Sequence, residues 1–276
     1  MKVLLLLVAL LQTAGICRPV HGTAALEQQR QQAVVADPPV GPARVDGRSC
    51  TDAGFDDCEG RRDGVPALLP FPAPDPDDPY VGARYAFDAE DRYLYARREV
   101  IMATRYALHR TAEVFPFDAP LGILDICQAD GLTPGTDDGD ARHPGSSHGQ
   151  GGNIDLAYFQ IGPDNRARIV CGDGSVHEDG YCSTGASALH TVDLEREAFF
   201  LAMLADFDDG RRLRVIGVDR ELQTPLEAEL DRLAADGFLD EQLRDRTKGR
   251  LASGDGWPYH HHHVHVSFRW WEADGS

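Results

Sequence analysis

Features that would point to several common classes of protein are missing from this sequence. The formal net charge is −18, from 45 acidic against 27 basic residues, and no basic stretch stands out. Such a chain is a poor partner for a polyanion, which argues against nucleic-acid binding. The acidic runs "DPDDP" and "TDDGDA" lack the Asp-x-Asp-x-Asp-Gly spacing with a following glutamate that calcium loops show, so we interpret them as solvated loops.

The sequence also lacks an apolar run that suits a membrane span. Residues 3–16, "VLLLLVALLQTAGI", follow a single positive charge and are too short and too close to the amino end. This pattern predicts a secretory signal peptide over residues 1–24, a periplasmic or secreted location, and no membrane span in the mature chain. Cys17 leaves a lipoprotein open as the alternative, although Ile16 is bulkier than the residue that normally precedes a lipidated cysteine.

No two cysteines have the Cys-x-x-Cys spacing, which argues against a cysteine-bound structural zinc ion. Export would place the cysteines in an oxidising compartment, where disulfides persist. Cys171 and Cys182 lie in one loop rich in Gly and Asp, and we predict that they form a bridge. Cys50 and Cys58 are a second close pair, whereas Cys127 ends the apolar run "LGILDIC" and is predicted to be a buried thiol.

The chain divides by composition into three parts. After the predicted signal peptide, residues 25–80 are rich in Pro, Gln, Gly and Asp without sustained periodicity, which predicts a linker or an extended wrap. Residues 81–276 are the predicted folded domain, and no internal repeat is visible.

Within that domain, helical and strand patterns interleave irregularly. Leu94, Ile101 and Leu108 recur every seven residues, which predicts a helix capped by Asp88 and ended by "PFDAP", residues 116–120. A second helix is predicted over 194–207, and a third from a capping box at Thr224 to Gly237. Strands are predicted at 121–127, 153–158, 213–219 and 263–268. This order predicts an α+β fold with a small, mainly antiparallel sheet.

The segment "HHHHVHVSF", residues 260–268, resembles a purification tag at first sight. Its second half alternates, which a tag or an exposed histidine run would not require. In a strand, successive side chains point to opposite faces, so the apolar residues would face a core while His263 and His265 share the other face. Two imidazoles on one face of a strand can bind the same ion.

Two further potential metal ligands lie in the loop before the predicted strand "NIDLAY" and in that strand itself. His148 and Asp155 are seven positions apart, joined by a glycine-rich turn that can bring the imidazole back towards the carboxylate. With His265 they make a His, Asp, His set. Zinc binds imidazole nitrogen and carboxylate oxygen, and three protein ligands with the fourth position left to water is the catalytic arrangement. We therefore expect one zinc ion per chain, held by these three residues on the sheet.

These residues carry a resemblance to a known family. Ser-x-His-x-x-Gly-x-Asn-x-Asp at 146–155, followed more than a hundred residues later by His-x-His at 263–265, resembles the LAS metallopeptidases. That group includes lysostaphin-type endopeptidases, D-Ala-D-Ala dipeptidases and carboxypeptidases, the zinc-bearing domain of hedgehog proteins, and penicillin-insensitive murein endopeptidases. The resemblance covers roughly residues 85–271, is specific at the zinc ligands and implies the LAS/hedgehog-like peptidase fold.

The resemblance also implies catalytic roles. D-Ala-D-Ala peptidases use a Glu three residues before the His-x-His as general base, and this chain has His260 there. The His-x-x-His-x-His run is similar to the murein endopeptidases, so His263 and His260 are the expected acid/base groups. Arg142 is a candidate for holding a substrate carboxylate, since arginine matches carboxylate geometry with two parallel hydrogen bonds. A solvated loop arginine is the alternative.

The expected function is therefore a secreted zinc peptidase that cleaves D-Ala-diaminopimelate cross-links of peptidoglycan peptides in the cell wall. Two alternatives remain open. One is a non-catalytic binding module of the hedgehog kind, in which zinc only stabilises the fold. The other is a D,D-carboxypeptidase, against which the absence of the Glu argues.

Overall fold

A computed structural model describes residues 61–62, 65–66, 68–135, 140–143, 148–161, 164–167, 170–171, 190–210, 212–253 and 260–269. The predicted signal peptide, the Cys50 and Cys58 pair, and Cys182 lie outside these residues. No helix in the described ranges combines the length and the apolar character needed to cross a membrane.

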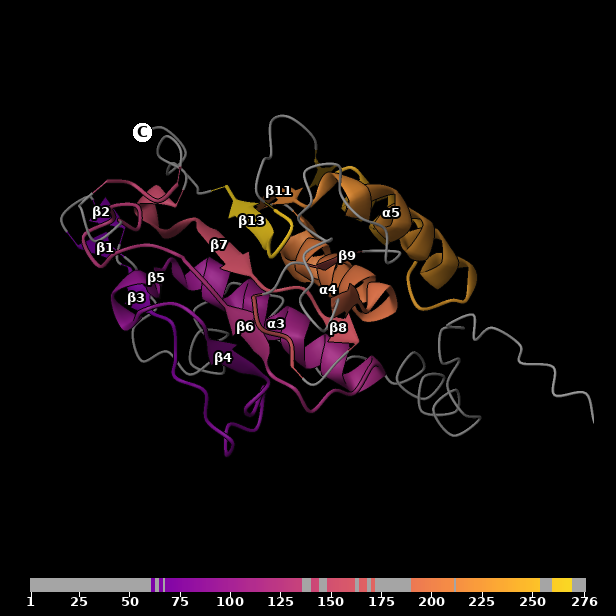
Figure 1. Ribbon diagram of the computed structural model, residues 1–276, viewed down its shortest axis with the longest axis horizontal. Helices are drawn as coiled ribbons and strands as arrows, with labels where there is room; N and C mark the ends of the chain where they lie inside the picture. Colours follow the sequence, from indigo (N-terminus) through magenta and orange to yellow (C-terminus); the bar gives the residue numbers. More distant parts are fainter. Residues whose placement is uncertain are drawn as a thin grey trace, which may run out of the picture.

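A six-stranded sheet forms the centre of the molecule (Figure 1). Its inner pairings, β6 with β7, β7 with β13 and β13 with β11, are antiparallel, and the outer pairings, β4 with β6 and β11 with β12, are parallel. The strands, in spatial order, are β12 (Leu251–Ala252), β11 (Leu213–Gly217), β13 (Val264–Phe268), β7 (Asn153–Leu156), β6 (Leu121–Ile123) and β4 (Tyr85–Phe87). The α+β prediction is confirmed, and the sheet, predicted to be small and mainly antiparallel, is a six-stranded mixed sheet.

The two parallel pairings follow from the helices that separate their strands along the chain. Helix α3 (Arg98–Val114) lies between β4 and β6, and helices α5 (Arg220–Ala235) and α6 (Glu241–Lys248) lie between β11 and β12. A tight hairpin can join only antiparallel strands, whereas a crossover through a helix returns the chain in the same direction. The fourth helix, α4 (Leu194–Asp206), lies between α3 and α5 (Figure 1).

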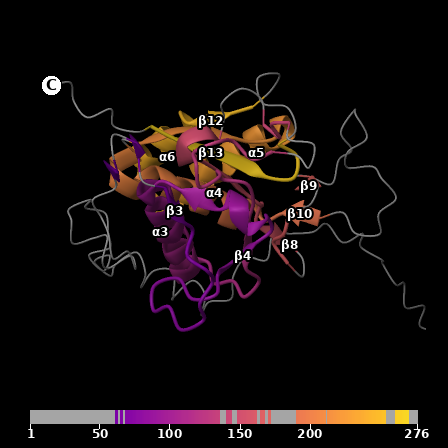
Figure 2. The ribbon, with the colours of Figure 1, turned by 90° about the vertical axis from the view of Figure 1, so that its left-hand side faces the viewer.

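Smaller elements surround this centre. A three-stranded sheet has the order β8 (Gln160–Ile161), β10 (His190–Val192) and β9 (Val170–Cys171), and it lies at one side of the molecule (Figure 2). Two two-stranded sheets pair β1 (Arg61–Arg62) with β2 (Val65–Pro66) and β3 (Leu69–Pro70) with β5 (Tyr95–Ala96). The 3₁₀ turns are η1 (Asp91–Tyr93), η2 (Gly149–Gly151) and η3 (Phe207–Gly210).

Helix α3 begins later than the sequence predicts. Ile101 and Leu108 are buried in it, but Leu94 is buried outside it, because the intervening chain forms β5 and pairs with β3. Asp88 does not cap the helix. Its carboxylate binds Arg166 and accepts a hydrogen bond from the backbone N–H of Ala167. The seven-residue spacing thus identified the correct buried face and the wrong starting point.

Helix α5 also begins elsewhere than predicted. Asp219 is its N-cap, because the Asp219 carboxylate accepts a hydrogen bond from the backbone N–H of Glu221 at 2.8 Å. The predicted cap at Thr224 is therefore wrong, and Pro225 lies inside the helix. The predicted end is confirmed, since Gly237 follows the helix with φ +80°, where a side chain would be strained.

Part of the predicted linker belongs to the folded body. Phe71 is only 4% exposed and packs in the main core, and β3 pairs with β5. Cys127 is confirmed as a buried free thiol.

Helix α4 carries a carboxyl group into the core. Glu197 is fully buried; its Oε2 accepts a hydrogen bond from the backbone N–H of Phe159 at 2.8 Å, and no described residue satisfies its Oε1. Burial raises the pKa of this carboxyl from 4.5 to about 8, despite the opposing effect of the Phe159 N–H. The folded protein therefore holds a proton that the unfolded chain releases above pH 4.5.

We expect Glu197→Gln to stabilise the protein increasingly as the pH rises from about 4.5 to 8. Wild-type stability falls over this window because the unfolded state is favoured by ionisation of the carboxyl, whereas glutamine does not titrate. At pH 7.5 the variant should gain about 4 kcal/mol in free energy of unfolding, from the size of the shift. Denaturant unfolding at pH 5 and pH 7.5 measures this difference. Equal stability gains at both pH values would contradict a neutral Glu197.

Candidate metal centre

The two central strands place a carboxylate and an imidazole side by side. In the antiparallel pairing of β7 with β13, Asp155 lies directly opposite His265, and directly paired residues project from the same face. The Asp155 Oδ1 and the His265 Nδ1 are 2.8 Å apart. The core side is filled as the alternation predicts, with Val264, Val266 and Phe268 buried. Asp155 and His265 are themselves 2% and 6% exposed, so the face they share is covered too.

His148 reaches the same point from the turn before β7. Both His148 and Gln150 have φ 62°, a left-handed conformation that costs non-glycine residues of order 1–3 kcal/mol. Arg97 holds the turn, since its backbone N–H bonds to the Gly151 carbonyl and its Nε bonds to the Gln150 carbonyl, each at 2.8 Å. A side chain at Gly151 would clash with Leu68, at 2.5 Å. The glycine-rich turn therefore brings the imidazole back over the strand, as its sequence suggested.

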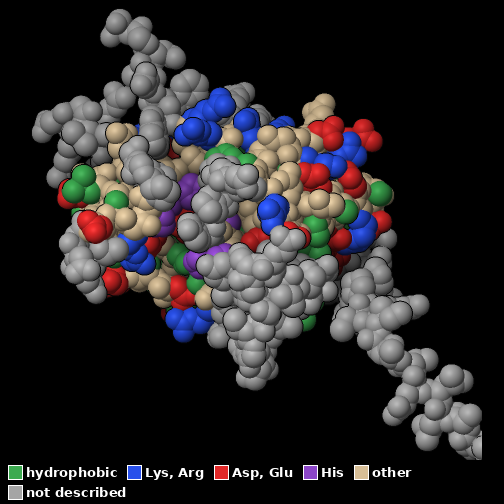
Figure 3. Space-filling view, turned by 45° about the horizontal axis from the view of Figure 1, so that its top comes forward, with side chains coloured by type: hydrophobic (Ala, Val, Ile, Leu, Met, Phe, Trp, Pro, Cys, Tyr) green, Lys and Arg blue, Asp and Glu red, His purple; other side chains and the backbone are tan. Residues whose placement is uncertain are grey.

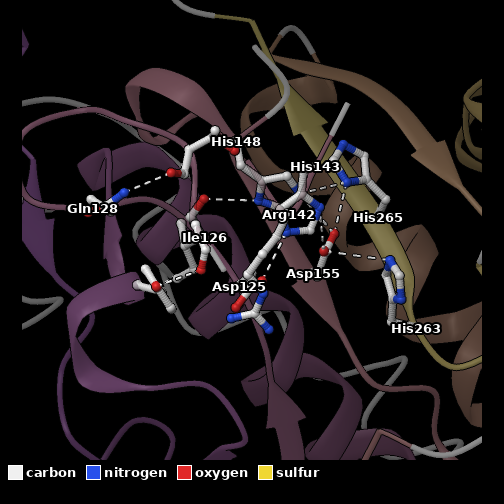
Figure 4. Close-up of polar contacts among 12 residues, drawn as sticks. Asp125, Ile126, Gln128, Arg142, His143, His148, Asp155, His263 and His265 are labelled. Carbon is white, nitrogen blue, oxygen red and sulfur yellow. Dashed lines mark hydrogen bonds and ion pairs between the residues drawn. The ribbon is translucent and has the colours of Figure 1, made fainter. Parts of the chain in front are cut away.

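Three atoms of these residues form a small triangle (Figure 4). His148 Nε2 lies 3.2 Å from Asp155 Oδ1 and 3.1 Å from His265 Nδ1, and the third side is the 2.8 Å contact between Asp155 and His265. With bonds of about 2.0–2.2 Å, the ligand atoms of a tetrahedral zinc ion are about 3.3 Å apart. The triangle is thus close to the size that three zinc ligands require.

The hydrogen-bond partners of His148 fix the tautomer of its ring. His148 Nδ1 lies 2.9 Å from the carbonyl oxygen of Ile126, which can only accept, so Nδ1 carries the hydrogen of the neutral ring. Nε2 then presents a lone pair to the Asp155 carboxylate. Burial lowers the pKa of His148, which keeps its ring neutral. Burial would raise the pKa of Asp155, but the neighbouring imidazoles hold it well below its usual range. His265 Nδ1, 2.8 Å from Asp155 Oδ1 and 3.1 Å from His148 Nε2, can donate its proton to these acceptors, and a divalent cation would replace that proton and bind all three atoms.

A histidine that the sequence patterns did not single out lies beside this group. His143 stacks on His148 with ring centroids 4.0 Å apart, and its Nδ1 is 3.9 Å from Asp155 Oδ2. One ligand atom each from His143, His148 and Asp155 lie within 4.8 Å of one another, so these three residues could also hold a metal ion. His143 Nε2 is 2.9 Å from Asp125 Oδ2, which fixes the orientation of its ring.

The predicted catalytic histidines lie on the other side of Asp155. His263 Nε2 is 3.6 Å from Asp155 Oδ2, and its Nδ1 is 3.1 Å from His262 Nε2. Burial lowers the pKa of His263 to about 3, against the opposing effect of Asp155. His260 precedes β13, and its ring centroid is 4.8 Å from that of His263 and 5.9 Å from that of His265. All the predicted histidines therefore lie within one cluster.

Arg142 lies at the more exposed edge of the cluster, with 40% of its side chain accessible. Its Nε is 3.4 Å from Asp125 Oδ2, and its guanidinium lies 5.4 Å from the ring centroid of Tyr93. The arginine is thus bound to a carboxylate of the protein itself. Histidine side chains are visible at the surface near the middle of one face (Figure 3).

Sequence reasoning missed Asp125 and His143 for different reasons. Asp125 is the single charged residue in the apolar run 121–127, a signal that could have marked it. Its backbone C=O accepts from the N–H of Asp155 at 3.0 Å, which places it next to the metal group. His143 lies in a loop without periodic spacing, so only the folded chain brings it to His148.

Comparison with known proteins adds nothing to this geometry. No family model matches the sequence, and no significant match to a curated protein was found. The likeness to the LAS metallopeptidases therefore depends on the motif residues alone.

Proposed function

We propose that this protein is an exported zinc metallopeptidase that cleaves D-Ala-diaminopimelate cross-links in peptidoglycan. The observation that carries the proposal is the triangle formed by His148 Nε2, Asp155 Oδ1 and His265 Nδ1, with sides of 3.2, 3.1 and 2.8 Å. Two nitrogens and one carboxylate oxygen are the ligand types of catalytic zinc sites, in which the fourth position is left to water.

When bound, zinc supplies a Lewis acid that activates water and polarises the carbonyl of the scissile bond. The residues of the chain do the remaining work. Asp155 contributes the negative charge of the site, and the Ile126 carbonyl keeps the lone pair of His148 Nε2 directed inward. His263 or His260 would take the proton of the attacking water and return it to the leaving amine.

The substrate class rests on the resemblance of the histidine run to the murein endopeptidases. His260 stands where carboxypeptidases of the group carry a Glu, which favours internal cross-links over terminal D-alanine. Arg142 would meet a carboxylate of the peptide by leaving Asp125, from which it is 3.4 Å away at the exposed edge.

One observation favours a second candidate function. His143 is close enough to the group to act as a metal ligand. If it joined the other three, the zinc ion would have four protein ligands, which is the closed arrangement of structural sites. The protein would then be a zinc-stabilised binding module rather than an enzyme.

Digestion of purified dimeric muropeptides tests the proposal. We expect conversion of dimers into monomers by cleavage of the D-Ala-diaminopimelate bond, identified by product mass. Penicillin should have no effect, because the mechanism uses no serine nucleophile for a β-lactam to acylate. Chelators should abolish the activity and added zinc should restore it. Release of D-alanine alone from uncross-linked pentapeptides would indicate a carboxypeptidase, and full zinc content without any hydrolysis would indicate the binding module.

A further inference from the structure

The side chain of Tyr158 contacts the histidine segment through its hydroxyl but is not a member of the metal group. It comes three residues after Asp155, just past the end of β7, and it is fully buried. It is among the largest fully buried side chains. The sequence motif gives Tyr158 no role in the proposed reaction.

The Tyr158 hydroxyl uses both of its hydrogen-bonding functions on backbone groups. It donates to the carbonyl oxygen of His260 at 2.8 Å, since a carbonyl can only accept. It accepts from the backbone N–H of Asp219 at 3.0 Å. Burial raises the pKa of this hydroxyl well above its usual value, so the donating proton is retained. One oxygen atom thus fixes two segments that are distant in the sequence.

Those two segments differ in how firmly the fold holds them. Asp219 is the N-cap of α5, immediately after β11, and is therefore anchored by the helix and the sheet. His260 belongs to the short segment before β13, outside any strand or helix. The Tyr158 hydroxyl consequently ties the His260 backbone to the anchored side of the structure.

The position of this backbone sets the point from which the His260 side chain extends. The ring centroid is 4.8 Å from that of His263 and 5.9 Å from that of His265, close to the group but not within the triangle of ligand atoms. A shift of about 1 Å in a catalytic group can cost a large factor in rate. Losing the carbonyl anchor would therefore act on the reaction through His260.

We propose that Tyr158 is a positioning residue for His260, acting through the hydrogen bond to the His260 carbonyl. The inference rests on the proposed peptidase function for its kinetic consequence, but the effect on the position of His260 does not. Tyr85 provides a matched control, because it is 1% exposed and its hydroxyl also donates to a backbone carbonyl, that of Pro72, at 2.8 Å.

The kinetic test is a double-mutant cycle of Tyr158→Phe and His260→Ala on muropeptide dimers. We expect Tyr158→Phe to keep its zinc and to lose about tenfold in kcat with little change in KM, as misplacement of a catalytic group predicts. In the His260→Ala background, the same substitution should have no further effect on kcat. Tyr85→Phe should lower the melting temperature comparably and leave kcat unchanged. Equal losses from Tyr158→Phe in both backgrounds would overturn the inference.

A second measurement does not depend on activity. In cobalt-loaded protein, the His260 ring protons should show paramagnetic shifts, assigned by their loss in His260→Ala. These shifts should change in Tyr158→Phe and stay constant in Tyr85→Phe. Changed shifts in a protein that hydrolyses no muropeptide would uphold the positioning of His260 and refute the peptidase function, whereas unchanged shifts would refute the positioning itself. Should Tyr158→Phe fail to fold, the Glu197→Gln background supplies a more stable host for the same comparison.

Discussion

Replacing Asp155 by alanine is expected to leave a folded protein that retains no zinc and has no activity. Asp155 is the only anionic member of the triangle, and it faces both His148 and His265 at hydrogen-bonding distance. Without it the site offers imidazoles alone and does not neutralise the charge of a divalent ion. Elemental analysis after gentle purification should find about one zinc per wild-type chain and close to none in the variant.

Asp88→Ala is the matched control for this experiment. Its carboxylate is also largely covered and paired with an arginine, Arg166, but no residue of the metal group contacts it in the described structure. This variant should keep its zinc. Thermal unfolding adds a second readout, because zinc should raise the melting temperature of wild type and of Asp88→Ala but not of Asp155→Ala. Undiminished zinc in a folded Asp155→Ala protein would show that the ion lies elsewhere.

Substitution of His263 by alanine is expected to separate metal binding from catalysis. His263 approaches Asp155 Oδ2, whereas the triangle uses Oδ1, so the three ligand atoms stay in place when its ring is removed. The variant should keep one zinc per chain and lose at least about 10²-fold in rate, the usual contribution of a positioned acid/base group. The His265→Ala variant should lose both its zinc and its activity.

A neighbouring histidine provides the control for His263. The ring of His261 lies beside that of His262, with centroids 5.1 Å apart, and it precedes the residues that reach Asp155. His261→Ala should therefore change neither zinc content nor rate by a large factor. Loss of zinc in His263→Ala would assign that residue to metal binding, and an unchanged rate would remove it from the mechanism.

The parts of this fold that the sequence predicted are those with strong periodic signals. The alternation around His265 and around Asp155 marked β13 and β7, and the strand pairing places these two residues opposite each other. Helix α4 begins at Leu194, as its apolar pattern indicates. Single-strand patterns do not contain the partner of a strand, so the two outer parallel pairings could not be predicted from them.

The remaining differences arise where a local signal competes with tertiary structure. The spacing that includes Leu94 looks helical, yet the chain there pairs with β3. Helix α6 escaped prediction because only Leu243 and Thr247 are buried on it, too few to mark an apolar face. The Asp125 and His143 pair depends on a contact across 18 residues of loop and strand, which no spacing rule describes.

The position of β13 in the sheet has a consequence for how the protein acquires its structure. This strand lies between β7 and β11, although about a hundred residues of chain separate it from β7. Pairings of such large sequence separation form slowly, because the entropy of closing the intervening loop must be overcome before the contacts contribute. Until β13 is inserted, His148 and Asp155 lie together without His265. We therefore expect the three-ligand group to assemble in a slow step of folding, and a bound ion to retard unfolding by linking β7 and β13.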